Sequence, residues 1–298
     1  MKKIFLLLFL LLTLSSYSQN RYLDNLFEND KAVTRTYAHK DGKELTLDIY
    51  EPKKDTASLR PAIIFMHGGG FSGGSPKNEG EVTFAKMAAK KGYVAIQISY
   101  RLTRKGQSFG CDYQASGKIE TFRKAADDFL DAVDYIVAHN KEFRIDTSKI
   151  IVGGSSAGAE AVLNAVYNRS LLFSNSTRKF NNFAVVFSLA GAILDSRYIN
   201  ENNVVPAILF HGTADKLVPY ATAPHHFCSA EDPGYLILDG SRTIADMLKE
   251  LNSAYQIYTF QGAGHEISGM PIKQLPQVFQ FLKEVGIDQK VIQAEINL

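Results

Sequence analysis

Residues 152–160 read VGGSSAGAE and place two adjacent serines, Ser155 and Ser156, in a glycine-rich stretch that directly follows an apolar run. In the pattern Gly-x-Ser-x-Gly, the serine sits on a tight turn between a strand and a helix, where glycines on either side avoid collisions. Gly154 and Gly158 complete this pattern around Ser156, whereas the pattern around Ser155 is incomplete. The stretch therefore predicts a strand, a turn carrying Ser156 as a nucleophile, and a helix.

Strands and helices alternate along the chain on both sides of this turn. Near-alternation of apolar and polar residues, or continuous apolar runs, predict strands at 32–40, 45–52, 61–67, 93–100, 149–154, 183–191, 206–212 and 255–260. Helices are expected at 80–91, 117–139, 157–168, 242–252 and 273–284. This order indicates an α/β fold with a mostly parallel central sheet of about eight strands and helices on both faces. Ligand sites in such sheets gather at the carboxyl ends of the strands.

The N-terminus has the layout of a secretory signal peptide. Lys2 and Lys3 precede an apolar stretch at 4–14, and small residues offer a cleavage site near Ser18. The apolar stretch is too short to span a membrane, so we expect a secreted or periplasmic protein without a stable membrane anchor. Residues 1–18 are then the signal peptide, and residues 19–298, which show no repeat or linker, are expected to form a single catalytic domain.

Charge and cysteine content narrow the class of protein further. Removal of the signal peptide takes away Lys2 and Lys3, so the net charge falls from +2 to zero. A neutral chain without a basic tract gives no indication of nucleic-acid binding. Cys111 and Cys228 are the two cysteines, and an even count in an exported chain is compatible with a disulfide. The sequence leaves open whether they are bridged or free.

A second glycine-rich stretch, HGGGF at 67–71, follows a predicted buried strand. Backbone N–H groups in such a loop can stabilise the negative oxygen that develops during acyl transfer, and the expected donors are Gly69, Gly70 and Ala157. Ser72 also matches Gly-x-Ser-x-Gly, but a proline-containing segment follows it, so we expect it in a loop. No Lys-Ser/Thr pair follows the glycines, which argues against a nucleotide-phosphate loop.

A serine nucleophile needs a base, and in this fold the acid and the histidine follow the serine in that order. Four histidines stand too early in the chain: His39, His67, His139 and His211. His225 and His226 follow Asp215 closely with no strand between, and we expect them at the surface. His265 remains, after a predicted strand and a glycine-containing loop, and is expected to accept the proton of Ser156.

The expected acid is Asp215 in the stretch HGTADKLVP, which lies a few residues beyond its predicted strand. A carboxylate there would hold the imidazole in the correct tautomer and stabilise its positive form. Asp195, after the preceding strand, is the alternative. Glu266 is adjacent to the histidine, and adjacent side chains rarely face each other.

Together, HGGGF, GGSSAG, HGTADKLVP and GAGH resemble the α/β-hydrolase superfamily, specifically the HGGG-type carboxylesterases that are acetyl esterase/lipase-like and BD-FAE-like. The resemblance covers essentially the whole chain after the signal peptide. The resemblance implies a catalytic triad of Ser156, Asp215 and His265. It also implies an oxyanion hole formed by Gly69, Gly70 and Ala157. It implies no metal and no organic cofactor. The few residues before the HGGG strand leave no room for a large cap domain.

The resemblance implies a serine carboxylesterase that acts on short-chain acyl esters. The ester would be a small molecule or carbohydrate-linked, such as acetyl or feruloyl groups on polysaccharide. Two alternatives stay open: a serine peptidase of the prolyl-oligopeptidase type, although no propeller repeats are found, and a non-catalytic binding module of the same fold. The sequence also leaves open the oligomeric state and whether the tail at 288–298 is a helix, a strand or a frayed end.

Overall fold

The computed structural model of the protein describes residues 20–29, 31–175, 177–178 and 182–298. The predicted signal peptide, residues 1–18, lies outside this part of the chain. In the ranges that are described, no helix is both long enough and apolar enough to cross a membrane.

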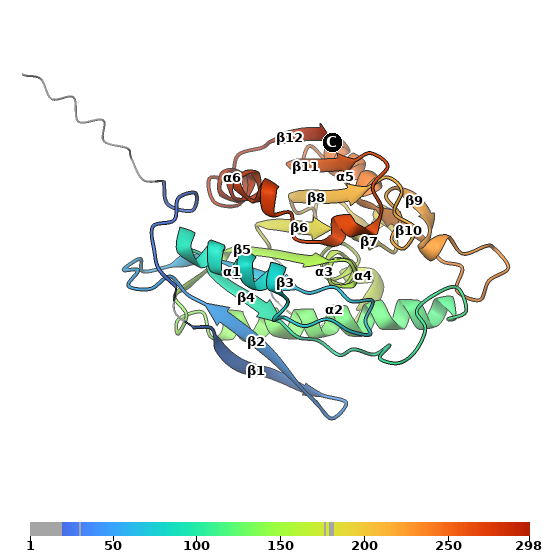
Figure 1. Ribbon diagram of the computed structural model, residues 1–298, viewed down its shortest axis with the longest axis horizontal. Helices are drawn as coiled ribbons and strands as arrows, with labels where there is room; N and C mark the ends of the chain where they lie inside the picture. Colours follow the sequence, from blue (N-terminus) through green and yellow to red (C-terminus); the bar gives the residue numbers. More distant parts are fainter. Residues whose placement is uncertain (1–19, 30, 176, 179–181) are drawn as a thin grey trace, which may run out of the picture.

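A central sheet, nine-stranded within the described residues, runs through the molecule in the order β1-β2-β4-β3-β5-β6-β8-β11-β12 (Figure 1). Its strands are β1 (Val33–Lys40), β2 (Lys43–Tyr50), β3 (Arg60–Met66), β4 (Val94–Ile98), β5 (Ile145–Ser155), β6 (Val185–Leu189), β8 (Ala207–Gly212), β11 (Tyr255–Phe260) and β12 (Gln293–Asn297). Strand β2 pairs antiparallel with β1 and β4, and all other neighbours are parallel. The predicted fold class, a mostly parallel sheet in an α/β protein, is confirmed.

The ninth strand, β12, comes from the C-terminal tail whose structure the sequence left open. It pairs parallel with β11, from Tyr255 opposite Gln293 to Thr259 opposite Asn297. Ala294 and Ile296 are partly buried between exposed neighbours, which is the alternation expected of a strand with one face toward the protein.

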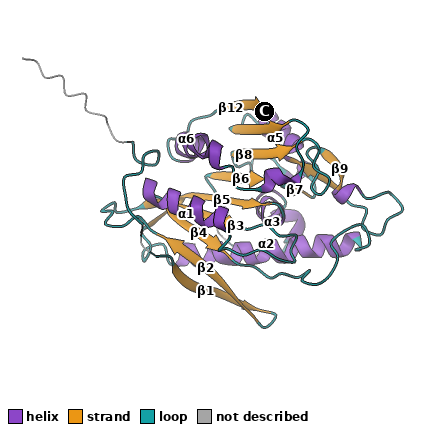
Figure 2. Cartoon of the chain, in the orientation of Figure 1, coloured by secondary structure: helices purple, strands orange, loops and turns teal. Residues whose placement is uncertain are grey.

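Helices cover both faces of the sheet (Figure 2). They are α1 (Glu79–Lys91), α2 (Ala115–Ala138), α3 (Ala157–Tyr167), α4 (Arg169–Leu172), α5 (Ser241–Glu250) and α6 (Leu275–Gly286). On one face, Phe84 of α1 stacks on Phe279 of α6 with ring centroids 5.6 Å apart, in the same core as Ile63 of β3. The neighbouring Ile64 belongs to the opposite core, with residues of α2, α3 and α5. Side chains alternate between the two faces of a strand, so β3 is buried along its whole length.

A small second sheet lies on the side toward which the parallel strands point (Figure 1). It consists of β7 (Ala192–Ile193), β10 (Ile237–Gly240) and β9 (Thr222–Pro224), in that order. No strand is predicted from the sequence in 222–241, where β9 and β10 lie. Strands of three and four residues are too short to show a periodic pattern.

Candidate active site

Ser156 lies between the end of β5 and the start of α3 in a strained backbone conformation, with φ 49° and ψ −123°. Such a conformation costs about 1–3 kcal/mol in a residue other than glycine, and it persists where the surroundings enforce it. Two glycines permit the turn. A Cβ on Gly158 would stand 2.2 Å from the carbonyl oxygen of Met66, and a Cβ on Gly154 would stand 2.5 Å from the backbone of Gly158. The spacing Gly-x-Ser-x-Gly therefore reflects close backbone packing around the serine.

Ser156, His265 and Asp215 form one chain of hydrogen bonds. Ser156 Oγ lies 2.7 Å from His265 Nε2, and His265 Nδ1 lies 2.7 Å from Asp215 Oδ2. A carboxylate only accepts, so Nδ1 carries the ring proton and Nε2 accepts from the serine hydroxyl. Asp215 is 1% exposed, and its other oxygen accepts from the backbone N–H groups of Leu217 and Val218. This arrangement can raise the nucleophilicity of a serine.

A second histidine, His211, lies beside the same oxygen of the carboxylate. Burial would raise the pKa of Asp215, but hydrogen bonds from His211 and His265 outweigh burial and hold that pKa well below its usual value. His211 Nε2 lies 3.1 Å from the carbonyl oxygen of Val218 and 3.3 Å from Asp215 Oδ2. A carbonyl only accepts, so the proton of His211 lies on Nε2, which donates to Val218 and lies beside the carboxylate. Asp215 is therefore an anion at neutral pH.

The other two acids considered from the sequence are paired elsewhere. Asp195 accepts from the backbone N–H and the guanidinium of Arg197. Glu266 accepts from the backbone N–H of Gly264. Of the three candidates, the structure places Asp215 against the histidine.

Ser155 has a different partner from its neighbour. Its hydroxyl donates to the carbonyl oxygen of Ser268 over 2.7 Å. Ser268 ends the short 3₁₀ helix η3 (His265–Ser268), which begins with His265. Ser155 thus fastens the segment that carries the base to the strand that carries Ser156, a role that the sequence did not indicate.

Gly69, Gly70 and Ala157 line the same cavity as Ser156, and the backbone N–H of none of them donates a hydrogen bond to another described residue. Gly69 has φ 122°, and a Cβ there would stand 2.3 Å from the carbonyl oxygen of Gly73. Ala157 opens α3, where the first N–H groups of a helix have no partner within the helix. Ser72 lies in the turn of this loop, as expected, and donates to the carbonyl of Gly69. Free N–H groups so placed can stabilise an oxyanion, at about 2.7–4 kcal/mol each.

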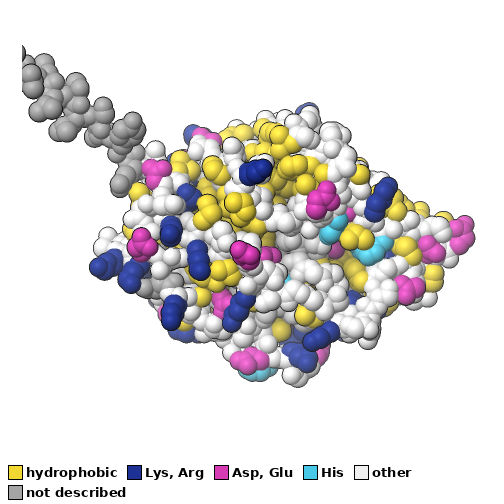
Figure 3. Space-filling model, viewed as in Figure 1, with side chains coloured by type: hydrophobic (Ala, Val, Ile, Leu, Met, Phe, Trp, Pro, Cys, Tyr) yellow, Lys and Arg dark blue, Asp and Glu magenta, His cyan; other side chains and the backbone are white. Residues whose placement is uncertain are grey.

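The cavity over Ser156 has a volume of about 600 Å³. Phe109, Leu217, Val218 and Met270 supply apolar parts of its wall. On the face drawn in Figure 3, histidine side chains lie together beside hydrophobic ones. A cavity of this size and mixed lining is typical of a small-molecule site.

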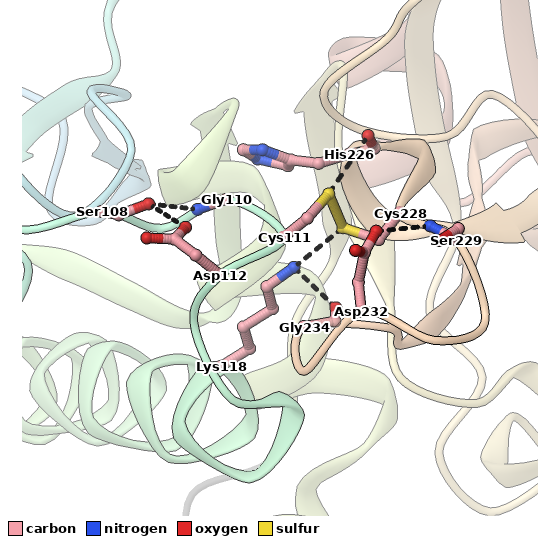
Figure 4. The surroundings of a disulfide bond; sticks show 10 residues. All are labelled: Ser108, Gly110, Cys111, Asp112, Lys118, His226, Cys228, Ser229, Asp232 and Gly234. Carbon is pink, nitrogen blue, oxygen red and sulfur yellow. Dashed lines mark hydrogen bonds between the residues drawn. A yellow bond between two sulfur atoms is a disulfide. The ribbon is translucent and has the colours of Figure 1, made fainter.

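A disulfide joins Cys111 to Cys228 across 117 residues of sequence (Figure 4). Phe109 lies just before the first cysteine and His226 just before the second, and both line the cavity. Lys118 Nζ, from α2, lies 3.7 Å from the sulfur of Cys228. The bond therefore ties together two parts of the cavity wall that are distant in sequence.

The prediction that His225 lies at the surface is wrong. His225 is 1% exposed, and its ring packs against Phe109 and Phe122 with centroids 5.4 and 5.8 Å away. His225 directly follows β9, and its backbone N–H donates to the carbonyl of Leu236. The small sheet therefore turns this segment inward. His226 is partly exposed and lines the cavity. Burial lowers the pKa of both histidines to about 3.

A mostly parallel sheet, with a serine on a strained turn between a strand and a helix and a histidine hydrogen-bonded to it, defines the α/β-hydrolase fold. The BD-FAE family model matches residues 47–195, which is half of the chain. The chain belongs to the BD-FAE family.

The chain is also similar to proteins that are named as esterases. Gut esterase 1 of Caenorhabditis elegans is 27% identical over 177 residues, which cover 59% of this chain and 29% of that protein. Ethyl acetate hydrolase of Pseudomonas putida is 28% identical over 120 residues, covering 40% of this chain and 33% of that protein. The chain thus spans a third or less of these relatives. Esterase 2 of Thermogutta terrifontis has the same fold, with a TM-score of 0.61 and 22% identity over 86% of this chain and 93% of that one.

Proposed function

We propose that the protein is an exported serine carboxylesterase that hydrolyses short-chain acyl esters. The observation that carries the proposal is the Ser156–His265–Asp215 hydrogen-bond chain, whose serine lies in the same cavity as Gly69, Gly70 and Ala157. The names of the relatives, a gut esterase and an ethyl acetate hydrolase, agree with this activity.

The reaction follows from the positions of these groups. His265 Nε2 accepts the proton of Ser156 as Oγ attacks the ester carbonyl, and the oxyanion accepts from the free N–H groups of Gly69, Gly70 and Ala157. When the tetrahedral intermediate collapses, the C–O bond to the alcohol breaks, and His265 returns the proton to the leaving oxygen. Water then attacks the acyl-enzyme with the same proton transfers and releases the acid. Anionic Asp215 stabilises the imidazolium during both steps.

The finer part of the proposal concerns substrate and compartment. We place acetyl or feruloyl esters of polysaccharide among the substrates, because a cavity of about 600 Å³ accommodates a small acyl group together with part of a bulky alcohol. We place the protein outside the cytoplasm because residues 1–18 have the pattern of a signal peptide and because disulfides persist in oxidising compartments. Cleavage near Ser18 is checked by determining the N-terminus of the protein recovered from the periplasm or medium.

The activity is tested with p-nitrophenyl acetate, butyrate and octanoate, with Ser156→Ala measured beside the wild type. We expect turnover that falls with chain length and is lost in the variant. Acetylated xylan and feruloyl sugars then test the carbohydrate-linked substrates. If the wild type is no faster than Ser156→Ala on any ester, the esterase proposal is wrong. Labelling by a fluorophosphonate and hydrolysis of a prolyl peptide substrate would then separate a peptidase from a binding module. A binding module reacts with neither reagent.

A further inference from the structure

Glu160 and His225 form a buried polar pair in the cavity wall that the mechanism above does not use. Glu160, on the first turn of α3, is 2% exposed, and its Oε1 lies 3.3 Å from Nε2 of His225. The contact does not have the geometry of a hydrogen bond. In the described part of the chain, Glu160 Oε1 and both ring nitrogens of His225 find no hydrogen-bond partner.

Such an arrangement is unusual in a folded protein. The large majority of buried polar atoms are hydrogen-bonded, and each one left without a partner costs about 1–3 kcal/mol. Here three such atoms belong to two adjacent side chains, and both side chains line the cavity that contains Ser156. Polar atoms of this kind beside a reactive serine indicate a place where a ligand supplies the missing partners.

The pair carries no charge at neutral pH. Burial raises the pKa of Glu160 to about 8, with His265 and Lys118 opposing and Asp215 assisting the shift. Burial, reinforced by Lys118, lowers the pKa of His225 to about 3. A protonated carboxyl group beside a neutral imidazole offers both donors and acceptors. It therefore matches a neutral polar group better than an ion.

We propose that Glu160 and His225 form a subsite for a hydroxyl group of the ester substrate, so that the enzyme selects hydroxylated esters over their alkyl counterparts. A hydroxyl group both donates and accepts, and it can satisfy an atom of each side chain at once. Phe109, whose ring packs against that of His225, lines the same cavity. The inference rests on the proposed esterase activity, and it concerns either half of the ester.

The magnitude follows from the cost of an empty subsite. A site built to hydrogen-bond a hydroxyl group disfavours an analogue that lacks it, because the polar atoms of the protein then stay unpaired. We expect kcat/KM to be higher for the hydroxylated ester by about tenfold or more.

The test uses two pairs of substrates. The acyl half is tested with p-nitrophenyl glycolate against p-nitrophenyl acetate, and the alcohol half with glycerol 1-acetate against propyl acetate. The ratio of kcat/KM within each pair is compared between the wild type and Glu160→Met, which has a similar volume but no hydrogen-bonding carboxyl group. Comparison between variants removes the intrinsic difference in reactivity between the esters.

We expect a preference in one of the two pairs that falls by about tenfold in Glu160→Met and is largely kept in Glu160→Gln, whose amide both donates and accepts. Glu81 also lines the cavity, and Glu81→Met is the matched control that should keep the wild-type ratio. If Glu160→Met does not fold, His225→Phe is the second variant. The phenylalanine ring can keep the packing against Phe109 and Phe122.

Two results would overturn the subsite: no preference in either pair, or a preference that is the same in the wild type and in the variants. The second includes equal losses for both esters, which would mean that the pair is only structural. If the wild type hydrolyses none of the plain esters, the proposed activity fails separately. Ligand-observed NMR with Ser156→Ala then measures binding of the same ester pairs. If Ser156→Ala prefers the hydroxylated ester and Ser156→Ala/Glu160→Met does not, the subsite is supported without turnover.

Discussion

Ser155 and Ser156 are neighbours in sequence, and their hydroxyl groups contact the two ends of the same short helix, η3. Ser156 Oγ meets His265, whereas Ser155 Oγ donates to the carbonyl of Ser268. Gly154 and Gly158 distinguish the two serines in the sequence, because only Ser156 is centred between them. The hydrogen bond from Ser155 to Ser268 depends on where η3 lies, and no local sequence pattern indicates that position.

Asp215 and Asp195 offer a matched pair of substitutions. Asp215→Asn removes the anion that holds His265 in its tautomer, and we expect kcat/KM on p-nitrophenyl acetate to fall by about 10³–10⁴. Asp195→Asn changes a carboxylate that pairs with Arg197, and its activity should match the wild type. The assignment of the acid would be reversed if Asp195→Asn lost activity and Asp215→Asn kept it.

Glu160 should make stability depend on pH. Its pKa is raised from 4.5 to about 8, so between these values the folded protein holds a proton that the unfolded chain releases. The free energy of unfolding therefore falls as pH rises through this window, by up to about 1.4 kcal/mol per pH unit. Glu160→Gln cannot titrate, so its stability relative to the wild type should increase from pH 5 to pH 8 in urea unfolding. A difference that is flat with pH would show that Glu160 is ionised in the folded protein.

The turn between β5 and α3 depends on glycine at a single point of contact. In Gly158→Ala the new Cβ would collide with the carbonyl of Met66, so β3 and α3 must move apart. We expect a loss of about 3 kcal/mol, a melting temperature lower by roughly 6–12 °C, and loss of esterase activity. Gly73→Ala, where a Cβ would meet nothing within 4 Å, is the control for calorimetry. Equal melting temperatures for both variants would contradict this account of the motif.

Elements with long periodic patterns could be predicted from the sequence, and short ones could not. Strand β3 and helix α2 lie within two residues of their expected bounds, because each buries a continuous or periodic set of apolar residues. Strands β9 and β10 exist because β10 pairs with β9 on one side and with β7 on the other, which is a tertiary property. The burial of His225 depends on that pairing, so it was missed as well. Glu160 left a signal that was not used: it is a carboxylate in the largely apolar helix α3, in which every residue is buried.

For the whole molecule, the order of the motifs sufficed to predict the sheet and to single out the residues of the hydrogen-bond chain. Each motif follows a strand of the same parallel sheet, so that residues 156, 215 and 265 meet at one edge. The number of strands could not be fixed, because β12 is a half-exposed edge strand with a weak pattern. Nor could the pairing of the two cysteines, which lie in connections whose paths no periodicity determines.

Removal of the disulfide tests how much the bond stabilises the molecule. On the chain-entropy model, a ring of this length contributes about 4–5 kcal/mol. The double variant Cys111→Ser/Cys228→Ser should therefore melt on the order of 10 °C below the wild type in calorimetry. The wild type without reductant and the variant with reductant are the controls. An unchanged melting temperature would show that the disulfide does not change the stability of the folded state relative to the unfolded state.

The presence of just two cysteines simplifies the oxidative maturation of this chain. A single chain can form only one disulfide, so its thiols have no wrong intramolecular partner and no isomers to sort. The first thiol is synthesised well ahead of the second, and in that interval it can pair only with a thiol from another molecule. Faulty oxidation is consequently a collision between chains, which rises with concentration. A dilute preparation should therefore recover the bond with oxygen or oxidised glutathione as the oxidant, without a disulfide isomerase.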